Sequence, residues 1–66
     1  MKSIEPVRVV IELDEELKHY QVSIEYKEDA KHRKHTDKEK FYKFIDALLT
    51  AITLSQGHRV ILECLI

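Results

Sequence analysis

The sequence contains too little cysteine, glycine and proline to belong to several classes of small protein. Cys64 is its single cysteine, so no disulfide can form within the chain, and this usage is typical of a reducing compartment. One glycine and one proline exclude a collagen-like or low-complexity chain and a glycine-rich phosphate-binding loop. The apolar stretches 47–54 and 60–66 are shorter than the roughly 20 residues that cross a bilayer, so we expect no membrane partner.

The chain is nevertheless apolar enough to fold. Of its 66 residues, 44% are hydrophobic and 35% are charged, a balance that favours a folded domain over a disordered segment. The length predicts one small domain over residues 1–66, and the lack of a signal-peptide pattern predicts a cytoplasmic location. A core of this size supplies only about 3–5 kcal/mol, and small domains commonly add a staple or a partner subunit.

Charge is distributed unevenly along the chain. Residues 1–30 hold four Lys or Arg and eight Asp or Glu, whereas residues 31–43 hold six and two. The net charge of −1 therefore combines an acidic first part with a basic middle segment. This distribution predicts a dipolar surface.

Two segments have the two-residue period of a half-buried strand. In residues 7–13 the odd positions are apolar, and in residues 20–26 the even positions are apolar or aromatic. The connection 14–19 is short and polar, as in a hairpin. Residues 59–66 are apolar on both faces and are predicted to form a third strand, with Cys64 pointing into the core.

A helix is predicted between the second and third strands. Residues 27–36 have no periodicity and are expected to form a charged connection. Thr36 and Glu39 have the spacing of a capping box, and Gly57 is a natural stop, so the helix is expected to run from about 37 to about 56. Its apolar stripe is expected to comprise Phe41, Phe44, Ile45, Leu48, Leu49 and Ile52.

These elements predict a single α+β domain of β-β-α-β order, in which one helix packs on one face of a three-stranded mixed sheet. The simplest sheet has the first strand in the middle, antiparallel to both others. The opposite face then has no cover, and Val10, Ile61 and Leu65 would form an apolar patch on it beside Arg8 and Arg59. Such residues are often ordinary surface residues, but here we interpret them as a partner-binding surface, most simply a homodimer interface, with the open sheet edges as a second route.

The basic segment suggests an alternative function. A nucleic acid could be contacted through phosphates by Lys31, Arg33, Lys34, Lys38, Lys40 and Lys43. No aromatic residue is interleaved in the loop for base stacking. A solvated loop and a site for an acidic protein are the other interpretations of this segment.

Catalysis, cofactors and metals are not expected. His32 and His35 have a spacing that can serve a metal, but a structural zinc site needs four ligands, and His19, His58 and Cys64 are scattered by the predicted strands. The carboxylates of Asp14, Glu15 and Glu16 are expected to be solvated at a hairpin tip. No nucleophile has a convincing base partner, and no cleft for a small-molecule substrate is expected in so small a domain.

In size and in its lack of motifs the chain resembles small proteins encoded by phages and other mobile elements, many of which regulate or inhibit a host complex by surface binding. The sequence thus predicts a non-enzymatic protein-binding module, dimeric and acting as a regulator or inhibitor through its open sheet face and edges.

Overall fold

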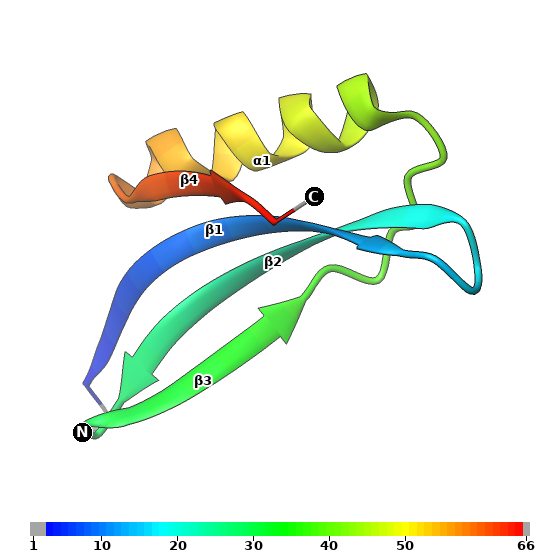
Figure 1. Ribbon diagram of the computed structural model, residues 1–66. Coiled ribbons are helices and arrows are strands. Elements are labelled where there is room, and N and C mark those ends of the chain that lie inside the picture. Colours follow the sequence, from blue (N-terminus) through cyan, green and yellow to red (C-terminus); the bar gives the residue numbers. More distant parts are fainter. Residues whose placement is uncertain (1–2, 66) are drawn as a thin grey trace.

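Two antiparallel hairpins build most of the sheet in the computed structural model, which describes residues 3–65 (Figure 1). Strand β1 (Ile4–Asp14) pairs with β2 (His19–Glu28), and β2 pairs with β3 (Lys31–Thr36). The helix α1 (Phe44–His58) crosses one face, and β4 (Ile61–Cys64) completes the sheet. The expected α+β class is confirmed, but the sheet has four strands instead of three.

The additional strand, β3, lies in the segment that was expected to be a charged connection. A two-residue turn precedes it, in which Asp29 and Ala30 both have positive φ, 50° and 67°. Positive φ at both central positions is the geometry of the hairpin turn that matches strand twist, and it is usually signalled by Asn-Gly or Asp-Gly. Because alanine stands where glycine is usual, the sequence does not signal this turn.

The strand order is β3-β2-β1-β4, and β1 runs parallel to β4. The expected antiparallel pairing of the first and last strands is therefore wrong. The reason is the additional strand: β3 reverses the chain once more before α1, so β4 returns in the direction of β1. The first strand does lie between the second and the last, as expected.

The helix begins later than the sequence predicted. Thr36 ends β3 and its hydroxyl bonds that of Ser23 at 3.0 Å, so it does not cap a helix. The chain then stays along β2, where Phe41 and Tyr20 exchange backbone hydrogen bonds of 2.6 and 3.2 Å. This pairing holds the segment extended until α1 starts at Phe44. At the other end Gly57 is still helical, and Arg59 takes the left-handed conformation with φ 56° and ψ 45°.

The core lies between α1 and the sheet. Its fully enclosed members come from β1, β2, the segment before α1, and the helix itself: Val9, Ile11, Val22, Phe41, Ala47 and Ala51. The helix therefore packs through small side chains. Of the stripe expected from the sequence, Leu48 packs against the core, but Phe44, Ile45 and Leu49 are 39%, 54% and 58% exposed. Cys64 is also exposed, which corrects its predicted burial.

A bulge changes the faces of β1. The register shifts between Pro6 and Arg8, which leaves Val7 unpaired with β2 and 37% exposed. Pro6 pairs with Tyr26 on the helix side, whereas Arg8 pairs with Glu25 on the opposite side. One inserted residue reverses the faces on either side of it, so Pro6 lies on the helix side together with the odd-numbered Val9 and Ile11, and Arg8 lies on the opposite side because it alternates with Val9.

Candidate functional site

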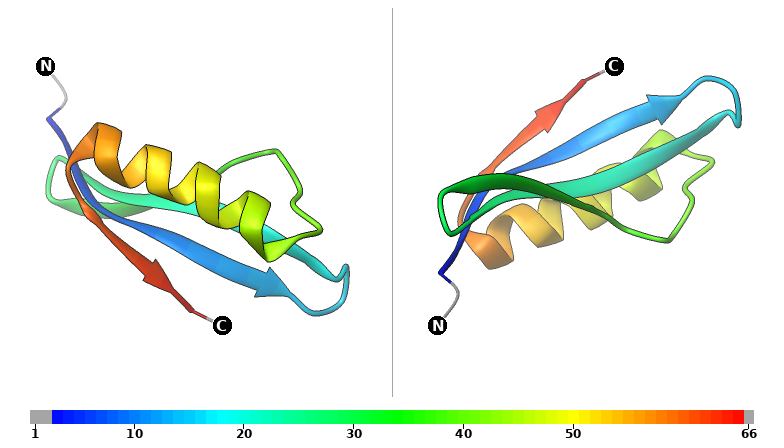
Figure 2. Two further views of the ribbon diagram at one scale, coloured as in Figure 1. Left: turned by 90° about the horizontal axis from the view of Figure 1, so that it is seen from above. Right: turned by 90° about the horizontal axis from the view of Figure 1, so that it is seen from below.

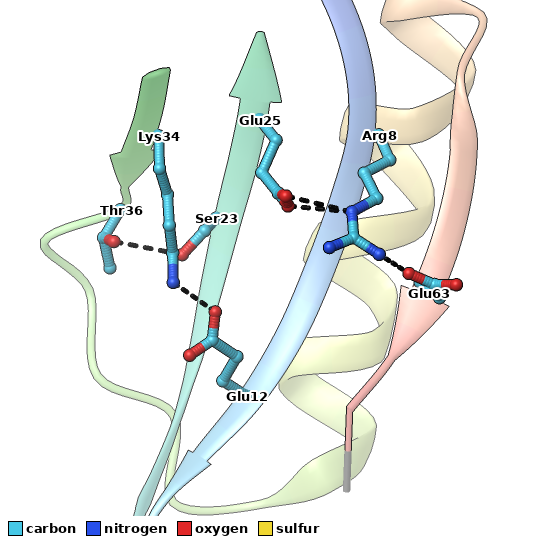
Figure 3. A network of polar contacts seen from close by, with 7 residues as sticks. All are labelled: Arg8, Glu12, Ser23, Glu25, Lys34, Thr36 and Glu63. Atoms are coloured by element: carbon cyan, nitrogen blue, oxygen red, sulfur yellow. Dashed lines mark hydrogen bonds and ion pairs between the residues drawn. The ribbon is translucent and has the colours of Figure 1, made fainter. Parts of the chain in front are cut away.

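The sheet face opposite α1 carries an ion-pair network centred on Arg8 (Figure 3). The Arg8 Nε donates to both carboxylate oxygens of Glu25, at 3.0 and 2.8 Å. A second guanidinium nitrogen of Arg8 forms an ion pair with Glu63 on β4. One cation therefore connects three adjacent strands, β2, β1 and β4.

The network continues towards the β3 edge. Lys34 on β3 reaches across β2 and forms an ion pair with Glu12 on β1. On the same face the Ser23 hydroxyl of β2 and the Thr36 hydroxyl of β3 hydrogen bond to each other. The face opposite the helix is thus covered largely by paired charges and hydroxyls. The expected apolar patch on that face is therefore reduced to Ile61 and Leu65, because Val10 is buried beneath the network.

Hydrogen bonding sets the charge states at the centre of the network. The bond from Arg8 lowers the pKa of Glu25 below its ordinary value, while desolvation of this carboxylate acts in the opposite direction. The same bond raises the pKa of Arg8. Both groups are therefore charged throughout the neutral pH range.

The five predicted partner-binding residues separate into two groups. Val10 is 1% exposed and lies beneath the network beside the equally buried Ser23, so it cannot serve as a surface anchor. Arg8 is held by Glu25 and Glu63. Ile61 and Leu65, in contrast, are 65% and 53% exposed. Arg59, exposed at the end of α1, precedes them along the chain.

Sequence reasoning missed an apolar flank on α1. Asp46 and Thr50 line a hollow together with residues 39–43. That segment lies on the side of the helix away from β4 (Figure 2), so Asp46 and Thr50 mark this side of α1. At 3.6 residues per turn, Ile45 and Ile52 lie nearly opposite Thr50, and therefore on the β4 side. The helix has more apolar positions than one sheet-facing stripe can hold, and this excess was the signal in the sequence that some of them lie on an exposed flank.

The apolar side chains next to the free edge of the sheet are here called the β4 surface. Three of them, Ile45, Ile61 and Leu65, are exposed, and the half-buried Ile52 on α1 and Leu62 on β4 complete the surface. Both Ile61 and Leu65 lie on the side away from the helix, because Ile61 pairs with Arg8 and side chains alternate along the strand. Leu62 pairs with Val9 on the helix side. The free backbone edge of β4 thus lies between two groups of apolar side chains.

The other edge of the sheet is basic. Residues Lys31 to His35 of β3 are all exposed, and the second set of candidate cations, Lys38, Lys40 and Lys43, follows in the segment before α1. The six nucleic-acid candidates thus divide between β3 and the segment before α1, and Lys34 lies on the opposite face of β3 from Lys31 and Arg33. Two of them are partly neutralised, since Arg33 forms an ion pair with Glu28 at 3.5 Å and Lys34 with Glu12.

Metal-binding and catalytic candidates are dispersed. Within residues 3–65 no three His, Cys, Asp or Glu side chains are grouped as metal ligands. His35 pairs with Ile24 and His32 with Lys27, which puts the two histidines on opposite faces of β3. Asp14 accepts hydrogen bonds from the Glu16 and Leu17 N–H groups, both at 3.1 Å, so its carboxylate has a structural role in the turn.

Two open hollows were not expected from the sequence. One, of about 480 Å³, lies between residues 39–43 and the start of α1. The other, of about 360 Å³, has a mainly apolar lining of Ile4, Pro6, Ile24, Tyr26, His35 and His58. Both are wide open to solvent, and neither brings a nucleophile and a base into an identified hydrogen bond.

No family model, no curated protein and no solved structure matches this chain. Within the described residues, α1 is too short and too polar to span a membrane.

Proposed function

We propose that this chain is a non-enzymatic protein-binding module, a small cytoplasmic regulator or inhibitor that binds its partner through the β4 surface. The observation that carries the proposal is the contrast between the two edges of the sheet. Edge strands bearing Lys on exposed positions are protected against pairing with other chains, and β3 has this character. The edge strand β4, Ile61–Cys64, bears no Lys, and its exposed neighbours include Ile45, Ile61 and Leu65 at 53–65% exposure.

Apolar burial would supply the binding energy at this edge. Fully burying one large aliphatic side chain contributes about 1.5–3 kcal/mol, and more than half of each of these three side chains is still accessible. An extended partner could also hydrogen bond to the free backbone of β4, in the manner of strand addition. The charged network on the adjacent face would form the polar rim.

A capture experiment with matched variants tests this site. Tagged wild-type chain is incubated with a cell lysate beside the Ile61→Lys variant and a control, Lys31→Glu, on the opposite edge. Proteins retained by the wild type and by the control but lost with Ile61→Lys support the proposal. Capture that is unaffected by Ile61→Lys, or that is lost only with the control, would contradict it.

Nucleic-acid binding is the second candidate, favoured by the six cations of β3 and of the segment before α1. The ion pairs of Arg33 and Lys34 leave fewer charges for phosphates. A gel shift with mixed DNA and RNA at low salt decides the matter: binding would fall with a slope of about −0.9 per phosphate contact on duplex DNA and weaken in Lys38→Glu. If no shift occurs at low salt, this candidate is eliminated.

A further inference from the structure

We propose that the partner at the β4 surface is a second copy of this chain, which pairs its β4 antiparallel to the first about a two-fold axis through Glu63. The two sheets then join into one, with both helices on the same side. This inference rests on the proposed function, because it names the partner for the same surface.

The backbone of β4 has the free groups that this pairing needs. The Leu65 N–H donates to the Ile11 carbonyl at 2.9 Å, so residue 65 points its backbone groups towards β1. Because the direction alternates along a strand, Leu62 and Cys64 point theirs away from the sheet. The described strand order ends at β4, and these groups have no strand beside them within residues 3–65.

A register centred on Glu63 uses these groups and covers the exposed apolar side chains. It places Leu62 opposite Cys64 of the second copy. These two residues then hydrogen bond to each other through their outward-facing backbone groups. It also places Ile61 opposite Leu65 of the second copy, on the face away from the helices. Ile61 and Leu65, which are 65% and 53% exposed in the single chain, then cover each other at two positions related by the two-fold axis.

The neighbouring symmetric register, centred on Leu62, fits less well. It would pair Val60 with Cys64, but the Val60 N–H already donates to the Ser55 carbonyl at 3.0 Å. It would also place Ile61 opposite the charged Glu63. The register through Glu63 avoids both conflicts.

Charge determines which edge can accept a second copy. Two β3 strands would bring two rows of Lys, His and Arg side chains together, and like charges directly opposite destabilise a strand pair. At β4 the only like-charge pair is Glu63 with its symmetry mate, and each carboxylate has its own Arg8 as counter-ion. One such pair costs less than the burial of four apolar side chains contributes.

Cysteine cross-linking tests the register directly. In a Cys64→Ser background, Glu63→Cys should form a disulfide-linked dimer, because opposing residues of a non-hydrogen-bonded antiparallel pair have Cα atoms about 4.5 Å apart, within the range that disulfides span. The matched controls Ile61→Cys and Leu62→Cys in the same background should link poorly, because each lies away from the axis. Efficient linking of Leu62→Cys instead of Glu63→Cys would overturn the proposal.

Sedimentation from about 1 µM to about 1 mM protein measures the dimer itself. Ile61→Lys should weaken the dimer at least tenfold, and Glu63→Gln should tighten it by up to about fivefold. Glu16→Gln, which removes a carboxylate from the exposed turn between β1 and β2, outside the network, should leave the dissociation constant unchanged. Circular dichroism confirms that each variant is folded.

The outcomes separate the two proposals. A chain that stays monomeric up to about 1 mM but captures a protein that Ile61→Lys loses overturns the second-copy partner and leaves the protein-binding function standing. A monomer with no capture dependent on the β4 surface overturns both.

Discussion

Replacing Ala51 by leucine should destabilise the protein more than truncating Leu49 to alanine. Ala51 is fully buried against the sheet, and adding methylenes to a packed core typically costs about 1–3 kcal/mol. Leu49 is 58% exposed, so its truncation removes less than half of the about 1.5–3 kcal/mol that full burial of a leucine supplies. The loss is therefore about 1 kcal/mol at most, and the higher helix propensity of alanine offsets part of it.

Urea unfolding followed by circular dichroism measures both effects. Protein concentrations are kept below those at which the chain self-associates, so that a change in the dimer does not enter the free energy of unfolding. Each kcal/mol should also lower the melting temperature by about 4–8 °C in a domain of this size.

The opposite result would refute the packing described for α1. If the helix presented the stripe predicted from sequence periodicity, truncating Leu49 would cost about 2–5 kcal/mol, as for a buried leucine, and leucine at position 51 would lie at the margin of the stripe and cost less than that. That pattern would also remove the flank formed by Ile45 and Ile52, on which the β4 surface depends.

Gly57→Ala should raise the free energy of unfolding by about 0.5–1 kcal/mol, because residue 57 is helical and an added Cβ meets no atom within 4 Å. Arg59→Gly should stabilise by about 1 kcal/mol, since the left-handed conformation is strained for an L side chain; urea midpoints of both variants check these values. Glu25 has a lower pKa in the folded protein than its ordinary value of 4.5, so its stabilising contribution is complete above that pH and is lost as the pH falls below it. Urea midpoints measured from about pH 7 to about pH 3 should therefore fall less steeply for Glu25→Gln than for the wild type, and equal slopes would refute the role of this carboxylate.

Strand periodicity predicted the hairpin and the helix-facing residues of β2, because burial of one face imposes alternation. The same reasoning failed for β3, where Lys, His and Arg on both faces leave no alternation to detect. What makes this segment a strand is its backbone pairing with β2 and the turn at Asp29 and Ala30. Neither depends on hydrophobic burial of the β3 side chains.

The limits of the helix could not be read from local signals. Thr36 and Glu39 have capping-box spacing, but the pairing of Phe41 with Tyr20 keeps the chain extended beyond them. Gly57 lies two residues before the position that takes the left-handed conformation, Arg59. At the start of the helix a tertiary contact overrides a local preference, because one cap is worth only about 1 kcal/mol.

The sequence predicted the exposure of Ile61 and Leu65 correctly but that of Val10 wrongly, because alternation alone does not show which side chains cover an outward-facing residue. Arg8 alternates with Val9 and lies on the same face as Val10, where its ion pairs help to cover Val10 and bring a guanidinium to Glu63. Without that guanidinium, Glu63 would be an uncompensated charge at the centre of the free edge, where a partner strand has to lie. The ion pairs of Arg8 thus remove one apolar anchor from the surface, and they also reduce the electrostatic cost of adding a strand at β4.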